Sequence, residues 1–127
     1  MSQLKMKILL VTVFIAILAF ATISYAADAA VRKANAADAE ALQKKFDTFT
    51  ENTPCTPNQT ACIKGAFAKC TVVQENGKFV NKFSIQPCNG ANLQCFVLPL
   101  VNSRGTSLVC TTKADRDARI EQAKKNL

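Results

Sequence analysis

The chain has 127 residues, a formal net charge of +7, six Cys and neither His nor Trp. The absence of His excludes the usual Ser-His-Asp and Cys-His hydrolase sites and leaves only Cys or carboxylate ligands for zinc. The sequence also contains no glycine-rich phosphate-binding motif. We therefore expect a single non-enzymatic domain without a cofactor or a metal site.

The first 26 residues follow the order of a secretory signal peptide. Two Lys residues precede an apolar run over residues 8–21, and small residues follow in the Ser-Tyr-Ala of residues 24–26. An uncleaved membrane anchor is the alternative, because this stretch approaches the roughly 20 residues that span a bilayer. We predict cleavage after Ala26, with Ala27 as the alternative site. The mature chain would then be extracellular or in the cell wall, without a stable membrane anchor.

The charge of the remaining chain is mildly basic. The first 26 residues hold two of the 16 Lys and Arg residues and none of the 9 acidic ones, which leaves a net charge of +5. The basic residues are scattered singly or in pairs such as Lys44-Lys45 and Lys124-Lys125. A nucleic-acid-binding surface would have denser clusters, so we expect no nucleic-acid partner.

Residues 27–54 form an Ala-rich, Cys-free segment whose pattern predicts a helix of about four turns. One stripe of the helical period is apolar, and it consists of Ala39, Leu42, Phe46 and Phe49. Either Asn35 or Asp38 can cap the helix start, Pro54 ends it, and the residues before Asn35 look loose. So short a helix needs its apolar stripe buried, so we expect it to dock on the next segment. The alternative is a frayed pro-segment.

Residues 55–110 contain all six Cys: Cys55, Cys62, Cys70, Cys88, Cys95 and Cys110. In a small secreted chain without a CxxC pair, this number predicts three disulfides rather than a metal site. Fifteen pairings are possible, and the spacing does not choose among them. The disulfides are needed because so short a module buries too little apolar surface to fold alone.

The six-Cys module has the composition of two β-hairpins. Runs rich in strand formers cover residues 66–72 and 78–83, and Asn76-Gly77 between them is the strongest short hairpin signal. A second pair of runs covers residues 93–98 and 106–110. We therefore predict a small disulfide-rich α+β fold of two short antiparallel hairpins, flanked by an N-terminal and a C-terminal helix.

The C-terminal segment, residues 111–127, returns to a helical pattern. Thr112 followed three residues later by Asp115 resembles a capping box. The apolar face behind this cap is thin, and it consists of Ala114, Ala118, Ile120 and Ala123.

A modification site is predicted in the loop between the first two Cys. Asn58-Gln59-Thr60 is an N-glycosylation sequon without Pro in the middle position. In a secreted chain, Asn58 is therefore a candidate for a surface glycan.

Several motifs of the module resemble those of the fungal chitin-binding domains classed as carbohydrate-binding module family 19. These motifs are the Gly65-Ala-Phe-Ala-Lys-Cys70 strand, the Gly77-Lys-Phe-Val80 strand and the close pair Cys88 and Cys95. The flanks are similar to small secreted proteins of mushroom-forming fungi, in the Ala41 to Phe46 helix and the Leu98 to Ser107 run. The resemblance covers about residues 38–120.

The resemblance implies non-catalytic binding of chitin or a related cell-wall polysaccharide. We also expect the mature chain to be a monomer. Aromatic side chains stack on the apolar faces of sugar rings, and amides supply the flanking hydrogen bonds. Residues 27–127 contain no Trp or Tyr, and Phe79 occupies the place where the family often has Trp. On a strand Phe79, Asn81 and Phe83 share one face, so we predict a sugar platform there that also uses Asn92 and Gln94. The alternative is that these Phe residues form the core, which is our expectation for Phe67 and Phe96.

Two other functions compete with sugar binding. The charge, the disulfides and the Lys-bearing terminal helices are compatible with a small cationic effector or antimicrobial protein that acts on cell surfaces. The charge is too diffuse for a strongly basic amphipathic helix, so we keep the cationic effector as the alternative to sugar binding. A hydrolase using Asp115 and Asp117 is disfavoured, because side chains two residues apart on a helix diverge and cannot flank one bond.

Overall fold

The computed structural model describes residues 28–125, which form a small disulfide-rich α+β domain. A helix over residues 28–46 is followed by a three-stranded sheet, a two-stranded sheet and a C-terminal helix, α2, over Lys113–Lys124. The predicted signal peptide lies outside the described residues. Among residues 28–125, every helix is too short or too polar to cross a bilayer.

The three-stranded sheet has the order β1-β2-β3, with both pairs antiparallel. β2 (Ala66–Glu75) and β3 (Lys78–Gln86) form the first predicted hairpin and extend beyond the predicted ends. Asn76 and Gly77 have φ angles of 52° and 77°, so both adopt the left-handed conformation of a type I′ turn. The sequence missed β1 (Thr60–Ile63), because four residues after a polar loop are too few to show a strand period.

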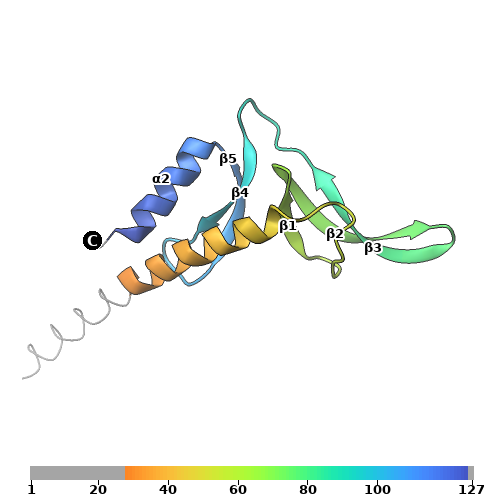
Figure 1. Cartoon of the computed structure of the whole chain (residues 1–127), viewed down its shortest axis with the longest axis horizontal. Helices are drawn as coiled ribbons and strands as arrows, with labels where there is room; N and C mark the ends of the chain where they lie inside the picture. Colours follow the sequence, from red (N-terminus) through yellow and green to blue (C-terminus); the bar gives the residue numbers. More distant parts are fainter. Residues whose placement is uncertain (1–27, 126–127) are drawn as a thin grey trace, which may run out of the picture.

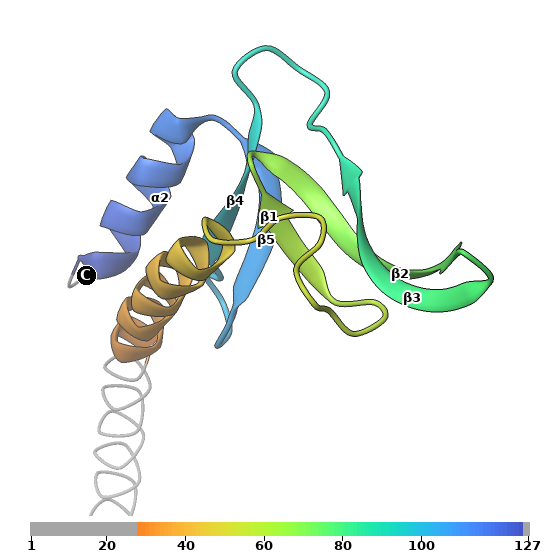
Figure 2. The same cartoon turned by 45° about the vertical axis from the view of Figure 1, so that its right-hand side comes forward.

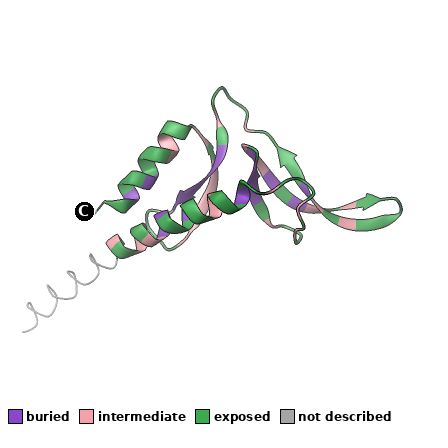
Figure 3. Ribbon diagram, in the orientation of Figure 1, coloured by how far each residue is buried: buried purple, intermediate pink, exposed green. Residues whose placement is uncertain are grey.

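The outer half of the β2–β3 hairpin projects away from the rest of the domain (Figure 1). Its base is buried between the other elements, whereas the residues near the Asn76-Gly77 turn are mostly exposed (Figure 3). The second predicted hairpin is also present, as β4 (Gln94–Pro99) paired with β5 (Thr106–Thr111). Figure 2 shows this two-stranded sheet beside the N-terminal helix and α2.

Three disulfides hold these parts together, as the Cys count predicted. Cys55–Cys70 ties the segment after the N-terminal helix to β2, and Cys88–Cys110 ties the β3–β4 connection to β5. Cys62–Cys95 joins β1 to β4 and is the disulfide between the two sheets. Beside it, the backbone N–H of Cys95 donates to the carbonyl of Gly65 at 2.9 Å. The sheets are therefore linked both covalently and by a backbone hydrogen bond.

The N-terminal helix differs from its predicted form at both ends. Residues 28–35, predicted to be loose, are helical, so neither Asn35 nor Asp38 is the N-cap. The helix ends at Phe46 rather than near Pro54, and Phe49 lies in the following turn, where its N–H donates to the carbonyl of Phe46. Ala39 and Phe46 are buried, and Leu42 and Phe49 pack against them, so the predicted apolar stripe does dock on the module.

Asn35 is fully buried and connects the N-terminal helix to the β4–β5 loop. Its side-chain amide donates to the carbonyls of Leu100 and Ser103 at 3.0 and 2.8 Å. Its oxygen accepts from the N–H of Gly105 and the guanidinium of Arg104, both at 2.8 Å. All four hydrogen bonds of an amide are thus satisfied, which makes burial of this polar group favourable.

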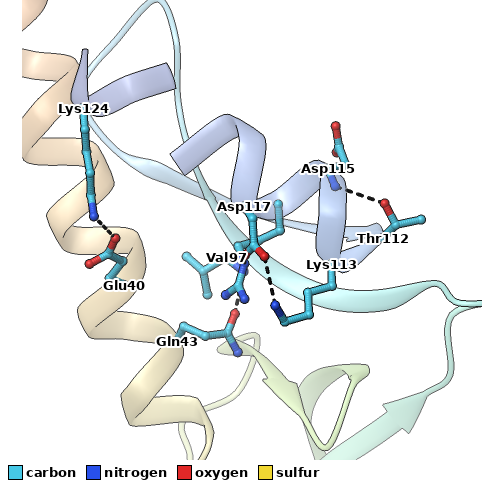
Figure 4. Close-up of polar contacts among 9 residues, drawn as sticks. Glu40, Gln43, Val97, Thr112, Lys113, Asp115, Asp117 and Lys124 are labelled. Atoms are coloured by element: carbon cyan, nitrogen blue, oxygen red, sulfur yellow. Dashed lines mark hydrogen bonds and ion pairs between the residues drawn. The ribbon is translucent and has the colours of Figure 1, made fainter. Parts of the chain in front are cut away.

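Polar contacts also join the N-terminal helix to β4 and to α2 (Figure 4). Gln43 accepts a hydrogen bond from the backbone N–H of Val97 at 3.0 Å, and Glu40 forms an ion pair with Lys124 of α2. The predicted cap of α2 is present, because the Thr112 hydroxyl accepts from the N–H of Asp115.

Replacing Asn35 tests the role of its buried amide. Asn35→Ala leaves two carbonyls and one backbone N–H without a partner, and each such buried group costs roughly 1–3 kcal/mol. We expect urea denaturation to show a loss of at least about 2 kcal/mol for Asn35→Ala and a similar or larger loss for Asn35→Asp, which has no donors. Asn102→Ala, in the exposed part of the same loop, should stay within about 0.5 kcal/mol of wild type. Equal stability of all three variants would contradict this role.

The three disulfides should contribute unequally to stability. Cys62 and Cys95 are buried and join the two sheets, whereas Cys110 is exposed at the surface. We expect the double variant Cys62→Ala/Cys95→Ala to lose about 2–5 kcal/mol of unfolding free energy or to fail to fold. The matched variant Cys88→Ala/Cys110→Ala should lose less and still unfold cooperatively. Urea midpoints compare the two, and a larger loss for the Cys88/Cys110 variant would refute the ranking.

Candidate functional site

The two Phe residues predicted to form a sugar platform lie in different environments. Phe79 is 77% exposed near the tip of the β2–β3 hairpin, whereas Phe83 is only 3% exposed. The ring of Phe83 contacts that of Phe49, with centroids 6.0 Å apart, and Phe49 in turn packs edge-on against Phe46. Phe83 is therefore a core residue, and the prediction that it belongs to an exposed platform is wrong.

Strand register explains why one sheet face has both a buried and an exposed part. Cys70 pairs with Phe83, Val72 with Asn81, and Gln74 with Phe79, so these six side chains lie on the same face. The first pair is covered by Phe49 and by Cys55 of the disulfide. The other two pairs extend beyond this cover, because the hairpin is longer than the segment that packs on it.

The four uncovered residues, Val72, Gln74, Phe79 and Asn81, form what we call the tip face. Val72 is 53% exposed, and it lies diagonally across the strands from Phe79. Two apolar side chains are thus flanked by two primary amides, with no charged residue among the four. The sequence predicted Phe79 and Asn81 on one face but missed Val72 and Gln74, which only the register of β2 against β3 identifies.

The charged residues of the hairpin lie on the opposite face. Glu75 pairs with Lys78 in the register, and it also forms an ion pair with Lys82 at 3.2 Å. Val73 and Val80 pair between them and are half-buried. These cross-strand contacts and the type I′ turn set the strand register of the projecting part, which places the four residues of the tip face on one side of it.

The other two residues of the predicted site lie far from the tip face. Asn92 is exposed in the β3–β4 connection with a φ of 62°, and Gln94 begins β4. The Gln94 side chain lies against Gly65, where a Cβ would come within 3.5 Å of it. Gly65 precedes β2 and Gln74 is nine residues further on, a separation of about 30 Å along a strand. The structure therefore does not bring Asn92 and Gln94 together with Phe79 and Asn81.

The remaining Phe residues of the module belong to the interior, as predicted. Phe96 is buried, and the guanidinium of Arg116 lies 4.8 Å from its ring centroid. Phe67 is half-buried and packs against the core. Asn58, the predicted glycosylation site, is exposed in the loop before β1. Its φ of 72° is a left-handed conformation that Asn tolerates.

The acidic residues of α2 are engaged in ion pairs. Asp115 pairs with Arg119 and also accepts a hydrogen bond from the Thr111 hydroxyl at 2.7 Å, which lowers its pKa below the ordinary value. Asp117 accepts from Lys113 at 2.9 Å and from Arg116, which lowers its pKa in the same direction (Figure 4). A general acid needs a raised pKa. The two carboxylates are thus suited to stabilising the helix surface rather than to proton transfer.

Comparisons with known proteins do not assign this chain to a family. No protein-family model, curated protein or solved structure matches the chain. Within residues 28–125, no group of three or more Cys or acidic side chains is arranged to hold a metal ion.

Two Phe→Ala variants separate the exposed from the buried part of this sheet face. Phe83→Ala removes a buried ring and should lower the unfolding free energy by about 3–5 kcal/mol. Phe79→Ala removes an exposed ring and should change it by less than about 0.5 kcal/mol. Urea denaturation measures both values. A loss above about 2 kcal/mol for Phe79→Ala would show that the tip face is covered in solution.

Proposed function

We propose that this chain is a secreted, non-catalytic polysaccharide-binding protein, and that its ligand is chitin or a related N-acetylated cell-wall polysaccharide. The observation that carries the proposal is the exposure of Phe79 beside the amides of Gln74 and Asn81 on a projecting hairpin. The three disulfides favour a secreted chain, because such bonds persist in oxidising compartments. The resemblance of its motifs to chitin-binding domains points to the same ligand.

The chemistry of the tip face suits a neutral polysaccharide. Sugar rings expose C–H groups on their faces, which an aromatic ring and a branched aliphatic side chain can cover. The surrounding hydroxyl and acetamido groups need both donors and acceptors, and each of the two primary amides offers both. The charged side chains Glu75, Lys78 and Lys82 lie on the other face of the hairpin. An acidic polymer would find no positive charge on the tip face itself.

The size of the tip face indicates weak binding at a single site. Burial of one Phe side chain contributes about 1.5–3 kcal/mol, and a dissociation constant of 1 mM already corresponds to about 4.1 kcal/mol. One sugar contact of this kind therefore gives low affinity. A binding assay therefore needs insoluble polysaccharide in large excess, so that the concentration of binding sites exceeds the dissociation constant.

The structure gives less support to a cationic effector that disrupts membranes. α2 contains four basic and three acidic side chains, and ion pairs connect Lys113 with Asp117 and Arg119 with Asp115. Lys124 is paired with Glu40 of the N-terminal helix. In the described part of the chain, the apolar faces of both terminal helices pack against the domain, with Ala39, Phe46 and Ile120 buried. A membrane-surface helix instead exposes its apolar face opposite its basic face.

A depletion assay with insoluble chitin tests the proposed function. We expect chitin to remove the wild-type protein from solution at low salt and Phe79→Ala to stay in the supernatant. Phe79→Trp should bind more tightly, because Trp has a larger face and a polar edge.

The matched control for this assay is Val101→Ala. Val101 is a comparably exposed apolar residue, 71% exposed in the β4–β5 loop, and its loss should leave depletion unchanged. Wild-type protein that remains in the supernatant, or equal losses for Phe79→Ala and Val101→Ala, would refute the proposal. Leakage of anionic vesicles by the wild-type protein would favour the effector instead.

A further inference from the structure

A concave surface lies at the other end of the sheet face that carries Phe79. The cavity has a volume of about 400 Å³, within the range of small-ligand sites. Its floor is formed by Ile63, Ala66 and Ile85. Ile63 pairs with Ala66 and Ile85 with Ala68, so the floor residues lie on the same face as Phe83 and Phe79. Ile85 is one of the exposed large apolar residues of the protein.

The rim of this cavity is polar and held in place. It consists of Thr50, Glu51 and Asn52 from the turn after the N-terminal helix and Lys64 from the β1–β2 turn. The N–H of Asn52 donates to the Thr50 hydroxyl at 3.2 Å, and the N–H of Thr50 donates to the Thr53 hydroxyl at 2.8 Å. Cys55 then fixes the end of the segment to β2. The backbone of this turn is therefore held in place, and the rim offers one carboxylate, one ammonium, one amide and one hydroxyl.

Lys64 has a left-handed backbone conformation, which is unfavourable for a Lys residue. Lys64 and Gly65 have φ angles of 49° and 80°, nearly the same as the 52° and 77° of Asn76 and Gly77. Both turns are thus left-handed at two positions, where Asn is tolerated and a long side chain is strained. The protein itself has Asn-Gly at one turn and Lys-Gly at the other. Backbone strain of this kind is typical of binding sites, and Lys64 lies on the rim of the cavity.

From this arrangement we infer that the cavity binds a single N-acetylated sugar residue. The acetamido methyl group packs on the aliphatic floor, the Lys64 ammonium donates to the acetamido carbonyl, and the Glu51 carboxylate accepts from the acetamido N–H or a ring hydroxyl. One positive and one negative charge on the rim match a neutral ligand that has both donors and acceptors. A sugar without the acetyl group leaves the floor and the ammonium without partners, so it binds more weakly.

This inference rests on the proposed function, because both name an N-acetylated glycan, but it concerns a different place. Ile85 lies six residues along β3 from Phe79, a distance of about 20 Å. The segment after the N-terminal helix covers the sheet between them. The cavity and the tip face are therefore two sites on one rigid unit, and a polymer that occupies both binds more tightly than a monosaccharide.

The test is a titration of the full mature chain with N-acetylglucosamine, glucosamine and glucose, followed by NMR through the Ile methyl signals. We expect N-acetylglucosamine to shift the signals of Ile85 and Ile63, and the other two sugars to shift them at least fivefold less at equal concentration. Equal shifts with all three sugars, or none with N-acetylglucosamine, would overturn the assignment.

Lys64→Asn is the variant that best separates a binding role of Lys64 from a structural one. It should raise the urea midpoint, because Asn suits the left-handed turn, and it should weaken N-acetylglucosamine binding at least fivefold. Lys64→Arg should keep most of the binding. A purely structural role for Lys64 predicts unchanged sugar affinity in Lys64→Asn, and that result would overturn the inference. Depletion of the wild-type protein by chitin, with unchanged Ile85 and Ile63 signals in N-acetylglucosamine, would overturn the cavity assignment and leave the tip face in place, so failure at the cavity and failure at the tip face are told apart.

Discussion

The packing of the segment after the N-terminal helix onto the middle of the three-stranded sheet determines which surfaces this protein presents. Phe49 covers Phe83, and Cys55 is bonded to Cys70, the residue that pairs with Phe83 across the strands. This contact seals only the central part of an apolar sheet face. Beyond it, Phe79 remains open at the hairpin tip, and at the other end Ile85 forms part of the floor of the cavity. One packing contact thus sets the position of both candidate binding surfaces.

Local chemistry explains the features of the fold that the sequence could predict. The Asn76-Gly77 turn needs two left-handed residues, and few other dipeptides supply them, so the hairpin was identifiable. Thr112 caps α2 through its own side chain, which is also a local interaction. The number of Cys, together with the predicted signal peptide, predicted three disulfides, but their pairing depends on how the two sheets meet. The contact between Gly65 and Cys95 that accompanies the Cys62–Cys95 bond joins residues 30 positions apart, and no spacing rule identifies it.

Asn35 and Phe83 show why the other predictions were wrong. Near the start of a helix, Asn is a common cap, and sequence alone does not reveal a loop about 65 to 70 residues away that takes all four of its hydrogen bonds. Strand alternation correctly placed Phe83 on the same face as Phe79 and Asn81, but alternation does not say where that face is covered. The cover comes from Phe49, in a turn that was predicted to be helix. Asn92 and Gln94 were grouped with Phe79 as polar residues of one module, and about 30 Å of strand separates Gln94 from it.

The length of the β2–β3 hairpin is itself an argument for a contact surface at its tip. The pairs from Val72 and Asn81 outward add no buried residue to the core, and an isolated two-stranded hairpin is marginally stable in water. This extension is maintained by its own ladder, the Glu75–Lys82 ion pair and the type I′ turn. Of the six Phe residues after the first 26, Phe79 is the one that lies exposed, although a domain this small has few large apolar side chains for its core. The proposed role of Phe79 and its neighbouring amides as a contact surface would account for this outer part.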